Sequence, residues 1–268
     1  MSARPDNENH LPVFGATLTL LAMLVAVDLI FILAHALHVW SPWMKGGQYS
    51  IESENGLAAL YQYIKQVWLA ACLALAFVQT RGRAFLGWTV LFAYLLVDDV
   101  LQLHERGGEL LAAKFGFPLM FGLRPQDLGE IAVAAIIGCF AVALVTVAYR
   151  RGGSGARQLS ADLMCLLAAL AVFGVFFDTL HTMAYFEAPA LAQAFALIED
   201  GGEMLVISAT TVYAFDITSN AGRMRVGVWS WVRGLTTALG SRAVSRPYRT
   251  SAQVYRRAVS IRASVTSR

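Results

Sequence analysis

Carboxylates and histidines recur inside stretches of this 268-residue chain that are otherwise apolar enough to cross a membrane. An ionised carboxylate at the centre of a bilayer costs roughly 2.5–3.5 kcal/mol. Several unpaired carboxylates would therefore remove most of the roughly 5–15 kcal/mol by which a folded protein is stable. These groups must consequently be paired, protonated, hydrated or bound to a metal ion.

The spacing of these residues favours metal binding. Asp178 and His181 are three positions apart and share one face of a helix, as do Asp200 and Glu203. Carboxylate and imidazole ligands without a thiolate suit iron, manganese or zinc, so we expect one or two divalent ions. The candidate ligands are Asp98, Asp99, His104, Glu105, Asp127, Asp178, His181, Asp200 and Glu203. Glu130 and Glu199 are the candidate general bases.

The segment around His104 needs a structural break to place its side chains together. Asp98, Gln102, Glu105 and Glu109 form one stripe of an ideal helix, and His104 lies to one side of that stripe. A bulge or a frayed helix end would aim His104 with Glu105. Di-metal carboxylate bundles use Glu-x-x-His pairs, which this sequence lacks, so both a mononuclear and a dinuclear site stay open.

These residues support three functions. The first is a metal-dependent membrane enzyme, hydrolytic or oxidative. The second is a cation- or proton-coupled transporter that uses the same acids as a relay; only Asp216 and the loops continue its polar path toward the other side. The third is a non-catalytic membrane subunit whose acids dock a partner.

Composition places these residues in an all-α integral membrane protein. Hydrophobic residues make up 57% of the chain and charged residues 15%, whereas soluble domains carry about 25% charged residues. A helical span needs about 20 residues. We expect a six-helix bundle over 11–216, with spans at Leu11–Trp40, Gly56–Thr80, Ala84–Glu109, Asp127–Tyr149, Ala161–Phe186 and Leu191–Asp216. Residues 111–125 are expected to form a loop, and Lys65 and Asp28 a salt bridge between the first two spans.

The arginines predict the orientation in the membrane. The turns near Arg81 and Arg150 are basic, and residues 217–268 contain ten arginines and no acidic residue. The positive-inside rule places these segments and the N-terminus, residues 1–10, in the cytoplasm, and the acidic clusters at the extracytoplasmic ends of the helices. We expect an inner-membrane protein whose tail forms interfacial helices on anionic lipid heads or is disordered. Nucleic acid is not an expected partner, and a homo-oligomer is compatible with the sequence.

An internal repeat links two of the acidic segments. Asp127-Leu-Gly-Glu130 and Asp200-Gly-Gly-Glu203 both read Asp-x-Gly-Glu before an apolar run, and we expect both at the start of a helix. Positions 127 and 200 are 73 residues apart. Each follows a segment with an aspartate and a histidine. The sequence thus predicts two repeated helical hairpins, with the first hairpin as a weaker third copy, and the repeated residues would converge on one centre.

Overall fold

The computed structural model describes residues 11–42, 44–54, 56–120, 122–151, 153–185 and 187–220, all within one compact unit. The N-terminal segment 1–10 and nearly all of the predicted cytoplasmic tail lie outside the described residues. The described chain is helical apart from an isolated bridge between Met120 and Leu123. Its elements are α1 (Leu11–Trp40), η1 (Gly47–Tyr49), α2 (Leu57–Thr80), α3 (Arg83–Leu101), α4 (Leu103–Phe115), α5 (Pro125–Arg151), α6 (Ser154–Ala171), η2 (Val172–Phe177), α7 (Asp178–Ala184) and α8 (Pro189–Ser219).

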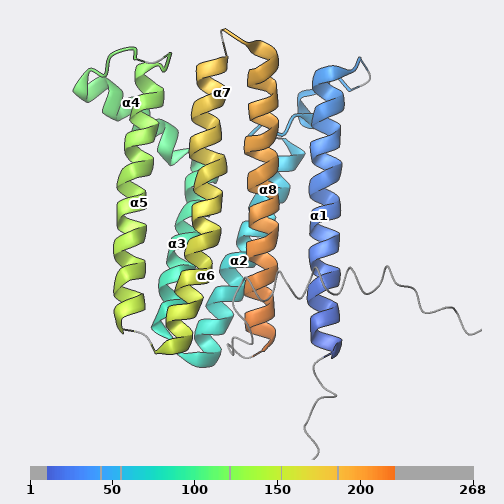
Figure 1. The fold of residues 1–268 in the computed structure, drawn as a ribbon, viewed down its shortest axis with the longest axis vertical. Helices are drawn as coiled ribbons and strands as arrows, with labels where there is room; N and C mark the ends of the chain where they lie inside the picture. Colours follow the sequence, from blue (N-terminus) through green and yellow to red (C-terminus); the bar gives the residue numbers. More distant parts are fainter. Residues whose placement is uncertain are drawn as a thin grey trace, which may run out of the picture. The chain divides into compact units, whose positions relative to one another are not determined.

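The long helices run up and down side by side, and Figure 1 shows α1 beginning at the end of the bundle where α8 finishes. Five of them are long and apolar enough to cross a membrane; these spans are Ala16–Trp40, Leu57–Thr80, Arg83–Leu101, Pro125–Val147 and Ser154–Ala184. The sixth expected span lies within α8. Because α8 carries Glu199, Asp200, Glu203 and Asp216, composition alone does not mark it as a span.

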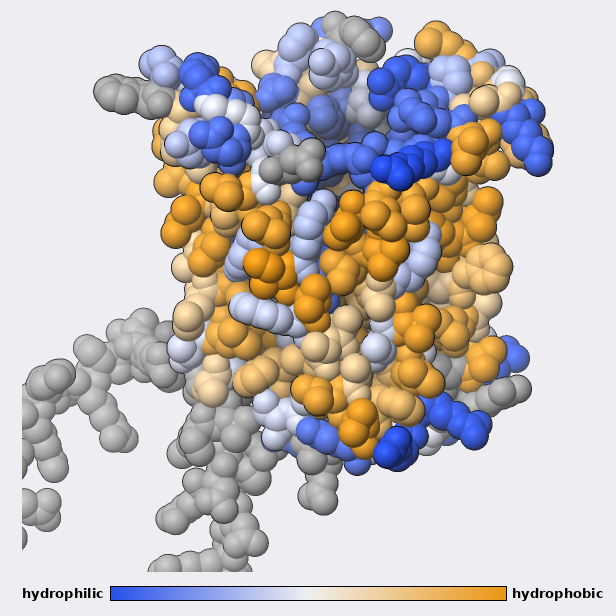
Figure 2. Space-filling view, turned by 180° about the vertical axis from the view of Figure 1, so that it is seen from behind, coloured by the Kyte–Doolittle hydropathy of each residue, from blue (hydrophilic) through white to orange (hydrophobic). Residues whose placement is uncertain are grey.

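The outer surface carries the apolar residues that a membrane would cover. On the face that Figure 2 shows, a hydrophobic band lies between two hydrophilic ends of the bundle. Large apolar side chains such as Ile30, Leu33 and Phe140 are mostly exposed, whereas a soluble monomer rarely exposes contiguous patches of this kind. The helices and this band together indicate a multi-pass membrane protein.

The polar residues of the spans face inward, and α8 is the element they surround. This helix contacts α1, α2, α6, η2 and α7. At its middle, the Lys65 ammonium lies 2.7 Å from the Asp28 carboxylate, and both side chains are fully buried. Lys65 also donates to the Met204 carbonyl at 2.8 Å and to the Ser208 hydroxyl at 3.1 Å. The predicted salt bridge is confirmed, and it joins α1, α2 and α8.

The expected span over 84–109 is wrong in one respect, because the helix breaks at Gln102. This residue has a φ of 53°, in the left-handed region, and separates α3 from α4. The expected loop over 111–125 is also partly helical, since α4 continues to Phe115. The helix that we expected to begin at Ala161 begins instead at Ser154.

The two repeated acidic segments occupy different places in their helices. Asp127 lies two residues after the start of α5 at Pro125, whereas Asp200 lies eleven residues after the start of α8 at Pro189. At 1.5 Å per residue, Asp200 is roughly 16 Å along its helix. The expectation that both motifs lie at a helix start therefore holds for α5 and is wrong for α8.

Candidate metal centre

Three of the predicted residues come together where α7 meets α8. One ligand atom from each of Asp178, His181 and Glu199 lies within 4.8 Å of the others. The His181 Nδ1 is 3.3 Å from the Glu199 Oε2. Two ligands that bind one ion at about 2.1 Å also lie roughly 3–4 Å apart, so this separation fits a shared metal ion. The side chains of His181 and Glu199 are 19% and 18% exposed, which leaves a route for an ion to enter.

A π-helical segment sets the direction of Asp178 and His181. Val172–Phe177 forms this segment, and Asp178 follows it directly as the first residue of α7. A π-turn adds a residue to the helical turn and rotates the side chains that follow, and such segments are frequent at functional sites. No pattern of polar and apolar residues in the sequence marks this segment, because all of its residues are apolar.

Two glycines allow this segment to pack close to α8. A Cβ at Gly174 would overlap the Glu203 carboxylate, and a Cβ at Gly202 would overlap the Phe173 ring. Only a residue without a side chain permits so close a contact. Glu203 therefore lies directly against the π-helical segment that positions Asp178.

Further acids surround the three residues. Asp178 interacts electrostatically with Glu130 and Asp127 on α5. Asp200 and Glu203 both interact with Glu199 and Asp178, and Glu203 also interacts with Asp99. Asp99 in turn accepts a hydrogen bond from the Gln66 amide. Side chains from α3, α5, α7 and α8 thus converge on one end of the bundle.

The second histidine group has a different geometry. The His104 Nδ1 lies 3.1 Å from the Asp98 carboxylate, and its Nε2 lies 4.0 Å from the Glu105 carboxylate. The hydrogen bond to Asp98 raises the pKa of His104 to about 9. Burial, and then a hydrogen bond with Glu54, raises the pKa of Glu105 to about 7. At neutral pH His104 is therefore a cation that forms an ion pair with Asp98.

Asp127 and Glu130 are held by neighbours on their own helix. Asp127 accepts hydrogen bonds from the Arg124 backbone and guanidinium, each at 2.7 Å. The Gln126 amide donates to Glu130 at 2.8 Å. Glu130 is coupled electrostatically to Asp127 and His104 and stands between the two histidine groups.

Two acids at this end were not among the predicted site residues. Glu52 interacts with His181 and Asp200, and its carboxylate lies 3.4 Å from the Nε2 of buried His35. Glu54 is hydrogen-bonded to Glu105. Glu54 is next to Asn55, which lies 72 residues before Asp127, so the spacing expected of a weak third repeat copy is the sequence signal for this segment.

The comparisons with known proteins give a family and no closer relative. No curated protein and no solved structure gives a significant match to this chain. A family model covers residues 11–217, from the start of α1 to two residues before the end of α8. The chain therefore belongs to the family described as "Domain of unknown function (DUF8692)".

Proposed function

We propose that this protein is a metal-dependent membrane enzyme that holds one divalent ion with Asp178, His181 and Glu199. The observation that carries the proposal is the meeting of three ligand atoms from two helices within 4.8 Å. Catalytic zinc sites use three protein ligands and leave a further position for water, whereas structural sites have four ligands. Iron, manganese and zinc all accept this set of one imidazole and two carboxylates.

Hydrolysis is the reaction that the surrounding residues support best. A divalent ion in such a site lowers the pKa of a bound water molecule and polarises a substrate oxygen. Glu130 is the residue we assign as general base, because it is coupled to Asp178 without being one of the three close ligands. Asp127 accepts a hydrogen bond from the Arg124 guanidinium, which holds this cation near Glu130 and Asp178. With iron in the site, oxidation is the corresponding reaction.

The remaining predicted ligands take supporting roles in this proposal. Asp200 and Glu203 lie beside the three ligands and interact with Glu199 and Asp178, and a second ion would need these two acids together with Asp99. Asp98, His104 and Glu105 form the neighbouring ion-paired group. Asp127 positions Arg124.

Elemental analysis of protein purified without chelators tests the proposal. We expect close to one equivalent of iron, manganese or zinc in the wild-type protein and a loss of that metal in His181→Ala. His104→Ala is the matched control, because this histidine pairs with Asp98 outside the three-residue group. A wild-type protein that neither contains nor takes up these metals would exclude the proposal, as would equal metal loss from both variants.

A second candidate function, proton- or cation-coupled transport, is favoured by the polar contacts that continue along α8. Below the metal centre lies the Asp28–Lys65–Ser208 group, in which the Ser208 hydroxyl donates to Asp28 at 2.5 Å. Nearer the other end of the helix, Thr17 donates to Asp216 at 3.0 Å. Proton-driven flux in liposomes that is lost in Asp28→Asn would support transport. Metal-dependent turnover without any such flux would support the enzyme instead.

A further inference from the structure

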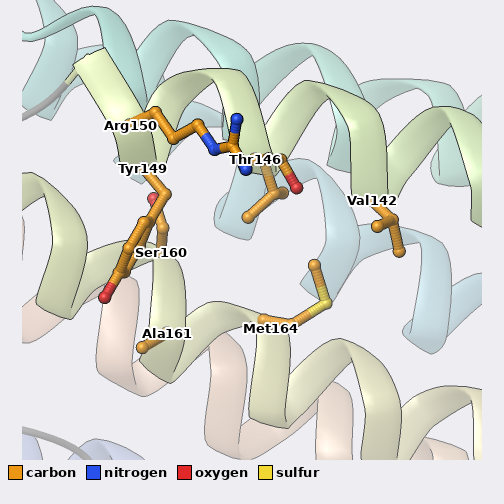
Figure 3. Close-up of a pocket in the computed structure, with 8 residues that line it drawn as sticks. Val142, Thr146, Tyr149, Arg150, Ser160, Ala161 and Met164 are labelled. Carbon is orange, nitrogen blue, oxygen red and sulfur yellow. The ribbon is translucent and has the colours of Figure 1, made fainter.

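A groove lies between α5 and α6, away from the metal centre. Its volume is about 380 Å³, within the range of roughly 300–1,000 Å³ that is usual for small-molecule sites. Figure 3 shows the side chains that line it, which come from the last turns of α5 and the first turns of α6. In the fold this is the end where the two helices join, opposite to the end that holds Asp178 and His181.

The two ends of the groove differ in chemistry. Val142, Val145 and Met164 give one part an apolar lining. Arg150 and Tyr149 lie at the other part, and Figure 3 shows the Arg150 side chain extended along α5 toward Thr146. The groove therefore has an apolar part and, next to it, a part with a positively charged side chain.

A buried hydrogen bond supports the wall of the groove. Ser160 lies behind the lining, and its oxygen accepts a hydrogen bond from the Trp88 indole at 3.3 Å. Ser160 is fully buried, so this contact joins α6 to α3 beside the groove.

The charge around the groove favours an anion that reaches it from the membrane. Arg150 is followed in the sequence by Arg151 and Arg157, and no acidic residue lies between 131 and 161. The apolar walls belong to the parts of α5 and α6 that are apolar enough to span a membrane. Basic pockets between transmembrane helices on the cytoplasmic side of a membrane bind the head groups of anionic lipids.

We propose that this groove binds an anionic glycerophospholipid, whose phosphate pairs with Arg150 and whose acyl chain lies along Val142, Val145 and Met164. A free phosphate ion would use only the cationic end and would leave the apolar walls without a ligand. A neutral lipid would fill the apolar part and would leave Arg150 without a counter-ion. Only an anionic lipid satisfies both parts of the groove.

The test measures the binding of dioleoyl phosphatidylglycerol and of dioleoylglycerol, which has the same acyl chains and no phosphate, to the delipidated full-length protein in detergent by native mass spectrometry. A basic residue near the membrane surface contributes about 1 kcal/mol to the binding of anionic lipid, which corresponds to roughly a fivefold change in affinity. We expect Arg150→Gln to weaken phosphatidylglycerol binding about fivefold and to leave dioleoylglycerol binding unchanged. Arg83→Gln is the matched control, because Arg83 begins α3 and does not line the groove.

A second variant tests the apolar part of the groove. Ala161 lines the groove and is exposed, so Ala161→Trp fills the space without disturbing the core. We expect this variant to weaken binding of both lipids severalfold. Equal effects of Arg150→Gln and Arg83→Gln would overturn the proposal, as would unchanged lipid binding in Ala161→Trp. Displacement of phosphatidylglycerol by glycerol phosphate alone would show that the head group suffices and would also overturn it.

Discussion

Two groups of aspartate, histidine and glutamate lie at the same end of this bundle, and only one has the geometry of a metal site. In the group at α7 and α8, Asp178, His181 and Glu199 offer ligand atoms within 4.8 Å of one another. In the group at α3 and α4, His104 pairs with Asp98 at 3.1 Å, while Glu105 is 4.0 Å away and bonded to Glu54. The residue types are the same in both groups.

The difference comes from the backbone between the residues. Asp178 and His181 follow a π-helical segment within one continuous helical stretch, and Glu199 faces them from the next helix. Asp98 and His104 lie on either side of a left-handed residue, Gln102, which ends α3 and begins α4. Because of this break, the His104 side chain points toward Asp98, and the positive imidazolium pairs with the negative carboxylate. The comparison shows that the same residue types form an ion pair in one place and a close group of three candidate ligands in another.

The largest effect that separates the two groups is expected on metal affinity. Glu199→Gln removes a charged ligand, and we expect a loss of at least roughly a hundredfold, since even outer-shell changes cost about 10–100-fold. Glu105→Gln in the other group should change affinity by less than about threefold. Isothermal titration with zinc measures both variants. Similar losses in the two variants would mean that the groups share the ion.

Closing the space beside the π-helical segment should disturb the acids around the first group. A Cβ at Gly174 would overlap the Glu203 carboxylate, so Gly174→Ala displaces that side chain from its packed position at a cost of about 1–3 kcal/mol. Gly138→Ala is the matched control, because nothing lies within 4 Å of its Cβ. Thermal unfolding in detergent and zinc titration report the result. A Gly174→Ala protein as stable and as tight-binding as the control would contradict this account.

The second group should make stability depend on pH. The pKa of His104 is raised to about 9 from 6.5, so its ion pair with Asp98 contributes fully below about pH 6.5 and is lost as the pH rises through about 9. Because the His104 side chain is 38% exposed, solvent screening limits the effect to about 1 kcal/mol. His104→Gln should remove this part of the pH profile. Unfolding of both proteins between pH 6 and pH 10 provides the measurement, and identical profiles would exclude the ion pair as the cause.

The smallest expected effect is long-range. Arg124 lies outside the three-residue group but interacts electrostatically with Asp178 and Glu130. Removing its positive charge in Arg124→Gln should raise the affinity for a divalent cation about two- to threefold, and screening by salt should diminish that gain. Zinc titrations at low and high ionic strength test this. A gain that does not depend on salt would point to a change in structure and not in charge.

The sequence by itself determined that the chain resembles a membrane protein and that its charged residues inside the spans need partners. Apolar runs of about 20 residues predicted the spans, five of which the structure supports by length and composition. The cost of burying charge predicted that the polar residues would be paired, and the Asp28–Lys65 bridge follows from that cost directly. The shared helix face of Asp178 and His181 followed from their spacing alone.

Tertiary structure decided which of these residues meet. The off-stripe position of His104 predicts a break near this residue, but only the structure places the break at Gln102. The π-helical segment before Asp178 leaves no local signal, because its residues are apolar throughout. The sequence predicted Glu199 as a general base. In the structure its carboxylate lies 3.3 Å from His181, because α8 begins eleven residues before Asp200 and passes α7 before it reaches these acids. Residue types set the chemistry that is available, while the packing of α7 against α8 sets which atoms are close enough to use it.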